Sequence, residues 1–425
     1  MKRTLVSLTL LCALSLLWPM AATAITLTTV PVGNPGNAAD SANSGSVPGI
    51  GSVSYNYSIG QYDVTVGQYT AFLNAVAGTD PYHLYNSSMA SDLNIAGISR
   101  SGSSGSYSYS VVGSANHPIT YVSWGDAARF ANWLANGQPI GGETLSTTED
   151  GSYYLNGATT TTLLNGVTRN ANASWVIPTE NEWYKAAYYN PGNSSYYQYP
   201  FSSSMMPTSA PPGSTANAGN IYGAGYAVTG SPGLSSTQNY LTDVGAYTAS
   251  ASPYGAFDMG GDVFQWNDAL ISGGRGLRGG SWTGYFGYLA SSYRTSLTPI
   301  SENNFFGFRL VTLGTSVVPF LRGDMNFDGH VNAADISAME LALTNLNAYL
   351  STNFGGGTPS SYGVTATNVG SYADVYGGTK FDNSDLEALL LDLNGGHGSA
   401  ESVPEPSTAV LASIACGLIW LLCAR

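Results

Sequence analysis

The chain has 425 residues, enough for one large domain and a smaller one. Only 9% of the residues are charged, and the formal net charge of −13 argues against nucleic acid as a partner, because phosphates are bound by lysine and arginine. This acidic balance fits cation binding better. The 29 tyrosines and many small polar residues indicate a loop-rich extracellular protein rather than a charged disordered tail.

The N-terminal end of the chain predicts export. A basic start precedes an apolar run over residues 5–18, and small residues follow at 22–24, so we interpret residues 1–24 as a signal peptide. A short membrane anchor is the alternative. The three cysteines all lie in terminal apolar segments, and residues 25–415 therefore contain no disulfide, thiolate ligand or thiol nucleophile.

The next elements are an extended segment, a helix and a loop. Residues 26–54 are rich in Gly, Ser, Asn and Pro and are expected to be extended. Apolar side chains then recur in steps of three and four, which predicts a helix within residues 64–76 that buries Val66, Tyr69, Phe72, Leu73 and Val76. The Ser, Gly and Tyr composition of residues 97–113 predicts a loop.

Two further helix starts follow. Residues 117–122 are expected to form a short strand that leads to Ser123, a good N-cap for the next helix. Thr179 and Glu182 form a capping box at the start of the helix after that. Residues 190–253 are rich in Pro, Gly, Ser and Asn, and an irregular region of this length usually carries functional loops or bound ions.

The stretch over residues 277–311 opens with an Arg-Gly-Gly-Ser turn and closes with Gly-Phe-Arg. Paired glycines let the backbone turn tightly, and each arginine offers a planar fork of donors. With four upstream blocks, this stretch resembles the formylglycine-generating enzyme family, also called sulfatase-modifying factor domains. The blocks stand in the family's order: Tyr62-Asp63-Val64-Thr65, Val122-Ser123-Trp124, Pro178-Thr179-Glu180, Tyr254-Gly255-Ala256-Phe257-Asp258-Met259, and Arg278 to Trp282 with Gly307-Phe308-Arg309.

The resemblance implies an α+β fold related to C-type lectins, with little regular secondary structure, over residues 25–315. It also implies calcium, which the family binds around one turn through positions that match the Asp258 side chain, the Gly261 and Val263 carbonyls, and Gln265. Gln265 stands where the family usually has Glu, and Asp262 where it usually has Asn, which should weaken the site. A turn closed by hydrogen bonds alone is the alternative.

The family's activity depends on copper between two cysteines just beyond the Arg-Gly-Gly-Ser turn, which oxidises a substrate cysteine with oxygen. The matching places fall near Gly284 and Leu289, and neither offers a donor to a soft copper ion. Copper is therefore not expected, and no catalytic residue is assigned. Related iron-using sulfoxide synthases need a histidine cluster, whereas the four histidines here are scattered. A hydrolytic carboxylate pair stays open.

Residues 316–397 carry an EF-hand-type loop with oxygen side chains at the required spacing and a glycine at the sharp turn. The calcium ligands that we predict are Asp324, Asn326, Asp328, the His330 carbonyl, Asn332 and Asp335. The final Asp resembles type I dockerin repeats, and a helix over residues 336–346 should follow. A second loop at residues 374–385 is degenerate, which puts recognition of a cohesin in doubt. An Asn/Asp turn without metal is the alternative.

The C-terminal segment, residues 398–425, resembles a PEP-CTERM sorting signal. It contains Pro404-Glu405-Pro406, an apolar run over residues 409–423 and a terminal Arg425. In that family a membrane protease of the exosortase type removes the tail. The resemblance therefore implies an exported protein, at the cell surface or outside the cell, that meets the membrane only through this segment before processing.

Two classes of function remain. The first is a calcium-stabilised binding or scaffold protein for extracellular polysaccharide or a surface protein, because tyrosine rings flanked by uncharged polar groups suit such surfaces. The second is an enzyme that kept the fold and changed its chemistry, which should show two convergent carboxylates, or a histidine with a carboxylate, in one pocket. The missing cysteines oppose a formylglycine-generating oxidase.

Overall fold

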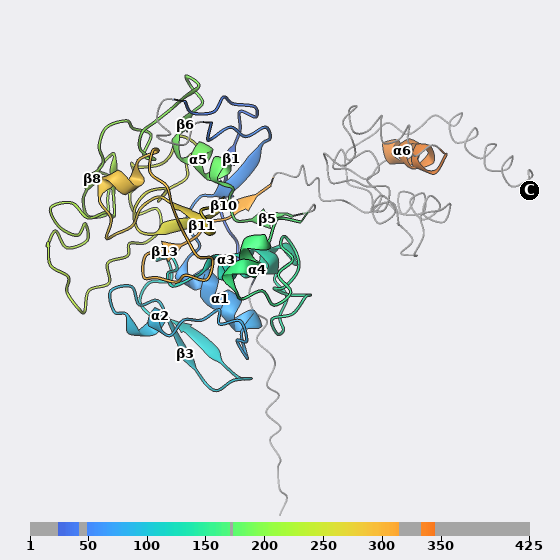
Figure 1. Ribbon diagram of the computed structural model, residues 1–425, viewed down its shortest axis with the longest axis horizontal. Helices are drawn as coiled ribbons and strands as arrows, with labels where there is room; N and C mark the ends of the chain where they lie inside the picture. The colour runs from blue at the N-terminus through green and yellow to red at the C-terminus, as the bar shows by residue number, and fades with distance from the viewer. Residues whose placement is uncertain (1–23, 42–48, 171–172, 314–332, 345–425) are drawn as a thin grey trace, which may run out of the picture. The chain divides into compact units, whose positions relative to one another are not determined.

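The computed structural model of the chain describes residues 24–41, 49–170, 173–313 and 333–344. The predicted C-terminal tail and all but the last residue of the predicted signal peptide lie outside these ranges. The chain divides into two compact units, residues 1–315 and residues 316–425. The first unit combines short helices, small sheets and long connections (Figure 1). This mixed helix and strand content is the α+β class expected from the sequence.

Three helices of the first unit begin with a capping box, in which two side chains satisfy each other's free backbone N–H groups. They are α1 (Val66–Val76), α3 (Trp124–Ala135) and α5 (Glu180–Tyr188). The predicted box between Thr179 and Glu182 is confirmed, and Ser123 caps α3 as expected, with Asp126 completing its box. The remaining helices are short, namely α2 (Ser88–Ser91), α4 (Thr161–Gly166) and the 3-10 helix η1 (Phe286–Leu289).

Two four-stranded sheets organise the first unit. The first has the order β1-β2-β14-β5, with every pair antiparallel, and consists of β1 (Thr29–Val32), β2 (Tyr57–Gly60), β14 (Val311–Thr312) and β5 (Trp175–Val176). The second has the order β12-β11-β10-β13, and consists of β12 (Thr295–Leu297), β11 (Gly274–Arg278), β10 (Phe264–Ile271) and β13 (Phe306–Gly307). Here β13 runs parallel to β10.

Two local predictions need correction. Residues 97–113 are a hairpin rather than a loop, because β3 (Ile98–Ser101) pairs antiparallel with β4 (Ser108–Val111). Residues 117–122 form no strand, and Pro118 makes only an isolated bridge to Thr65. The region over residues 190–253 is irregular as predicted, with short pairs of β6 (Tyr189–Asn190) with β7 (Ser195–Tyr196) and of β8 (Thr208–Ser209) with β9 (Ala218–Gly219).

The main core joins α1, α3 and α5 to the inner faces of both sheets. Tyr69 and Phe72 of α1 pack against Phe130 of α3, with ring centroids 5.9 and 5.2 Å apart. Trp266 of β10 is fully buried, and its indole N–H donates to the Val122 carbonyl at 2.9 Å. Burial of these large aromatic side chains is the main source of stability in a unit with few long elements.

Buried arginines stabilise the irregular connections. Arg129 pairs with Glu149 at 2.7 Å, Arg278 with Glu180 at 2.7 Å, and Arg309 with Asp63 at 3.3 Å. Each guanidinium also donates to backbone carbonyls of distant segments. The planar fork of arginine can satisfy several loop carbonyls at once, which a lysine cannot do.

Of the second unit, the structure describes one helix, α6 (Ala333–Thr344), which begins three residues before the predicted start. Asp335 lies in its first turn and is buried. The other predicted ligands of this loop, Asp324, Asn326, Asp328, His330 and Asn332, lie outside the described residues. None of the helices in the described part of the chain has the length and apolar character that a membrane span requires.

Candidate functional site

The Arg-Gly-Gly-Ser turn follows directly after β11 and is held by Arg278. The buried guanidinium of Arg278 donates to Glu180 Oε1 at 2.8 Å and to the carbonyls of Ser291 and Tyr293 at 3.1 and 2.7 Å. The turn itself requires glycine, because Gly280 has a φ of +73° and a Cβ there would lie 2.5 Å from a methyl carbon of Leu289. Arg278 thus fixes both the turn and the loop after it.

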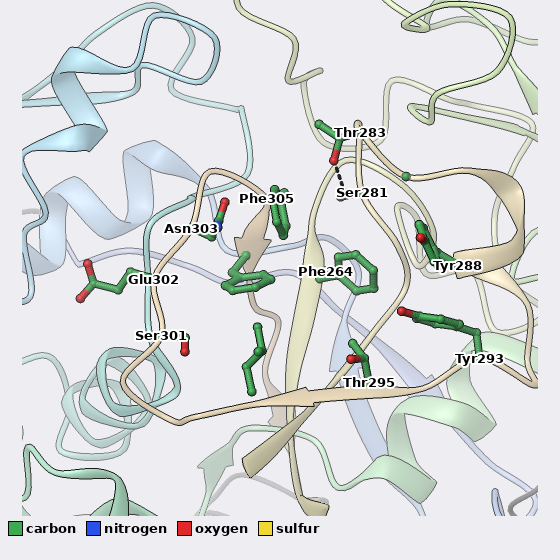
Figure 2. A pocket seen from close by; sticks show the side chains of 13 residues that line it. Phe264, Ser281, Thr283, Tyr288, Tyr293, Thr295, Ser301, Glu302, Asn303 and Phe305 are labelled. Carbon is green, nitrogen blue, oxygen red and sulfur yellow. Dashed lines mark hydrogen bonds between the residues drawn. The ribbon is translucent and has the colours of Figure 1, made fainter.

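A pocket of about 610 Å³ opens beside this turn. Figure 2 shows Tyr288 and Tyr293 on one side of it and Ser301 and Glu302 on the other, with Phe264 and Phe305 between them. The lining residues are Phe264, Ser281, Thr283, Gly284, Tyr288, Tyr293, Thr295, Leu297, Ser301, Glu302, Asn303, Phe305 and Phe306.

Aromatic rings form the walls of the pocket. The rings of Tyr288 and Tyr293 lie 4.8 Å apart, and Phe264 lies 6.2 Å from Tyr288 and 6.3 Å from Phe305. Tyr288 remains 39% exposed, so part of its ring faces solvent at the mouth. A flat ligand with apolar faces can therefore pack between rings while its edges stay hydrated.

Hydroxyl, amide and carboxyl groups complete the lining. Ser281 and Thr283 share a hydrogen bond of 3.2 Å between their hydroxyls. Asn86, which precedes α2, donates its side-chain N–H to the Glu302 carboxylate. Burial, assisted by the nearby Asp126 carboxylate, raises the pKa of Glu302 to about 8. Glu302 is the single carboxyl among the lining residues, which include no histidine and no cysteine.

The two positions that match the family's copper cysteines have different surroundings. Gly284 lines the pocket, and a Cβ there would come 2.9 Å from the Tyr288 ring. Leu289 is fully buried in an apolar cluster with Phe201 and Ile221. A Cβ on Gly260 would lie 2.9 Å from Leu289, so this leucine is tightly enclosed. Neither position offers a metal donor in this arrangement.

The turn predicted to bind calcium is ordered by hydrogen bonds. Gln265 Oε1 accepts from the Trp183 indole N–H at 2.6 Å and from Arg309 Nε at 2.7 Å. Gln265 Nε2 donates to the Asp258 carbonyl at 2.7 Å, and both lone pairs of the Gln265 oxygen are already used by the two donors. The Gly261 carbonyl accepts from the Val263 N–H at 2.7 Å. Of the four predicted ligands, Gln265 therefore fits a calcium ion least well.

Burial disfavours the charged form of the carboxyl groups around this turn. Asp258 accepts from the Gly245 N–H at 2.6 Å, and burial raises its pKa to about 6. Asp262 accepts from Asn220 and Thr242, and burial together with the Asp258 charge raises its pKa to about 7. Burial also raises the pKa of Asp63, against the opposing effect of Arg309. The described residues nevertheless contain no group of three or more His, Cys, Asp or Glu side chains arranged to hold a metal. Calcium at this turn stays a prediction.

Sequence reasoning missed most of the pocket. The tyrosine-rich composition of residues 282–293 was a usable signal for its aromatic wall. Glu302 had no local pattern to mark it, because its setting depends on Asn86 and on Asp126 of α3.

The fold and the turn geometry agree with a match to the sulfatase-modifying factor enzyme 1-like domain over residues 24–313. The chain belongs to this family, as the five sequence blocks indicated.

Similar curated proteins include the hercynine oxygenases of Mycolicibacterium smegmatis, 32% identical over 167 residues, and of Mycobacterium tuberculosis, 32% identical over 163 residues. Each alignment covers 33% of this chain. The alignments cover 34% of the first relative and 33% of the second, so the chain spans about a third of the length of each.

Similar solved structures include CarF, with 21% identity and a TM-score of 0.40 over 68% of this chain and 98% of that one. PvdO from Pseudomonas aeruginosa has 16% identity and a TM-score of 0.35 over 67% of this chain and 91% of that one.

Proposed function

We propose that the first unit is a binding module whose ligand site is the pocket beside the Arg-Gly-Gly-Ser turn. The observation that carries the proposal is the chemistry of the lining: five aromatic rings, hydroxyl and amide side chains, and one protonatable carboxyl. Such a lining can bind a neutral, hydroxyl-rich ligand by ring packing and hydrogen bonds. It provides neither the paired carboxylates nor the histidine that we expected of a catalytic pocket.

The cellular setting of this module is part of the proposal. We infer an exported protein whose C-terminal tail is processed by an exosortase-type protease and whose ligand is an extracellular polysaccharide or a surface protein. The signal-like start and the Pro-Glu-Pro tail support it. We also propose that calcium stabilises the protein, through Asp258 in the first unit and the loop that begins at Asp324 in the second.

An enzyme of changed chemistry is the second candidate. Two observations favour it: the raised pKa of Glu302 would suit a general acid, and the similar curated proteins are named oxygenases. The single carboxyl of the lining weighs against a hydrolytic pair. Formylglycine in a cysteine-containing sulfatase peptide, after incubation with this protein and copper, would overturn the binding proposal in favour of the family's activity.

The test is retention of the purified full chain on isolated cell-surface polymer, with calcium and with chelator. We expect saturable retention that falls about tenfold in Tyr288→Ala, because one well-packed ring contributes on the order of 1 kcal/mol or more. Tyr154→Ala is the matched control, since Tyr154 is 54% exposed and does not line the pocket. Equal loss in both variants, or no retention of the wild type, would contradict the proposal.

Stabilisation by calcium is tested by measuring the melting temperature as well as retention on the polymer. We expect chelator to lower the melting temperature of the wild type. Asp258→Asn and Asp324→Asn should each remove part of this shift, which separates the two predicted sites. A melting temperature that chelator leaves unchanged would contradict calcium stabilisation while leaving the ligand proposal standing.

A further inference from the structure

Two long segments beside the pocket contain no charged side chain. Residues 186–242 and residues 279–293 lack Asp, Glu, Lys and Arg altogether, in a chain that carries a net charge of −13. The segments are joined at the pocket, because the Tyr222 N–H donates to the carbonyl of the lining residue Gly284 at 2.9 Å. The surface around the mouth is therefore electrically neutral over both segments.

Two exposed aromatic rings and one half-buried ring lie on this neutral surface. We call Tyr222, Tyr285 and Phe286 the aromatic platform. Tyr285 is 55% exposed and Phe286 is 40% exposed, and the rings of Tyr222 and Tyr285 meet edge to face with centroids 5.3 Å apart. Apolar groups gathered in this way on a soluble protein usually mark a binding surface.

The platform and the pocket share one turn of chain. Tyr285 is the N-cap of η1, and the Tyr288 N–H donates to its carbonyl at 2.9 Å. A second layer of rings supports the platform: Tyr226 lies 4.8 Å from Tyr222, and Trp282 stacks on Tyr240 at 5.3 Å. The Tyr222 and Tyr285 rings are therefore packed beside the pocket, and such packing lowers the entropic cost of binding to them.

We propose that one chain of a neutral polysaccharide binds across both features, with one sugar ring in the pocket and the following rings on the aromatic platform. This rests on the function proposed for the pocket and adds the class and length of the ligand. β-Linked sugars present flat C–H faces to aromatic rings and hydroxyls to side chains such as Thr283 and Asn303. Anionic polymers gain no attraction from a neutral surface on an acidic protein.

A peptide is the other ligand that such a surface could bind. The adjoining sheet edge is β12, which has only three residues and offers little backbone for strand addition. The platform instead presents exposed aromatic rings and tyrosine hydroxyls, which suit sugar rings better than a peptide backbone. The test therefore includes an apolar peptide as a competing probe.

The experiment is calorimetric titration of the full chain with β-linked oligosaccharides of glucose, N-acetylglucosamine, mannose or xylose, in lengths from a single ring upward. For at least one sugar we expect affinity to rise about tenfold or more with length. The double variant Tyr285→Ala/Phe286→Ala should lose that gain, about tenfold for long chains, while it binds the single ring as the wild type does. Tyr154→Ala should behave as the wild type throughout, and melting temperatures verify folding.

Each other outcome has a defined meaning. Single-ring binding without any gain from length, or a gain that survives in the double variant, would overturn the platform and leave the pocket proposal intact. Tighter binding of polygalacturonate or of the apolar peptide would overturn the neutral-polysaccharide class. Failure of every oligosaccharide to bind would overturn the polysaccharide inference, whereas the proposed binding module is tested separately by the retention experiment with Tyr288→Ala.

Discussion

Arg309 shows at the residue scale how one side chain can organise several loops. Its fully buried guanidinium donates to Gln265, to the Gly60 carbonyl at 2.9 Å and to the Phe257 carbonyl at 2.8 Å, and it pairs with Asp63. These contacts join segments from opposite ends of the first unit. The sequence identified this arginine through the Gly-Phe-Arg block but could not identify its partners, because they are distant in the chain.

Arg309→Lys tests this role. A lysine keeps the charge but loses the planar fork, so it cannot donate to Gln265 and to the buried Gly60 and Phe257 carbonyls at the same time. We expect the free energy of unfolding to fall by about 2 kcal/mol or more, because each buried acceptor left without a donor costs about 1 to 3 kcal/mol. Chemical denaturation measures the change. Arg294→Lys serves for comparison, because Arg294 also pairs with a carboxylate but is partly exposed, and a loss as large there would refute the argument.

Glu302 gives the pocket a pH dependence at the same scale. Burial and the negative charges of Asp126 and Asp80 raise its pKa from 4.5 to about 8. Between these two values the folded protein retains a proton that the unfolded chain releases. The free energy of unfolding therefore falls as pH rises through this window.

Glu302→Gln should remove this contribution and make the stability profile less steep between about pH 4.5 and about pH 8, so that the variant gains relative stability at the alkaline end; the other buried carboxyls with raised pKa values, such as Asp258 and Asp262, keep the rest of the slope. Denaturation curves across this range provide the measurement. Glu340→Gln, at an exposed position of α6, should leave the slope unchanged. A wild-type slope that persists in Glu302→Gln would assign the pH dependence to other carboxyls.

At the scale of elements, the helices were predictable and most strands were not. The steps of three and four in α1 and the caps of α3 and α5 are local signals, and the structure follows them. The β3–β4 hairpin was missed because Ser, Gly and Tyr dominate it, although Ile98 is buried and Tyr109 is buried between exposed neighbours. β13 and β14 have two residues each, and only distant partners define them.

Ser123→Ala tests the cap of α3. The Ser123 hydroxyl accepts from the Asp126 N–H at 3.1 Å, and the Asp126 carboxylate accepts from the Ser123 N–H at 2.8 Å. Loss of the hydroxyl should lower the free energy of unfolding by about 1 kcal/mol. Urea denaturation would measure it. Thr160→Ala removes the exposed cap of the six-residue α4 and should lower the free energy of unfolding by less. A larger loss in Thr160→Ala than in Ser123→Ala would contradict this account.

For the whole molecule, the family and its mixed fold followed from ordered blocks in the sequence, whereas the ligand pocket emerged only from the assembled chain. The pocket draws on β10, on the Arg-Gly-Gly-Ser turn and on the segment from Tyr293 to Phe306. The sequence showed that Gly284 and Leu289 cannot bind copper. It could not show that the Tyr288 ring lies against Gly284. Side chains that line a pocket from separate elements follow no regular spacing in the sequence, so a sequence pattern does not predict them.

The place of β14 has a consequence for when this unit can fold. β14 lies between β2 and β5 and pairs with both, yet it is the last strand of the unit to be synthesised. Until residue 312 has left the ribosome, the first sheet lacks an inner strand, and Arg309 has only just become available to join Gly60 to Phe257. The first sheet therefore cannot be completed before residue 312 has been synthesised, and its outer strand β5 has no partner within the sheet until then.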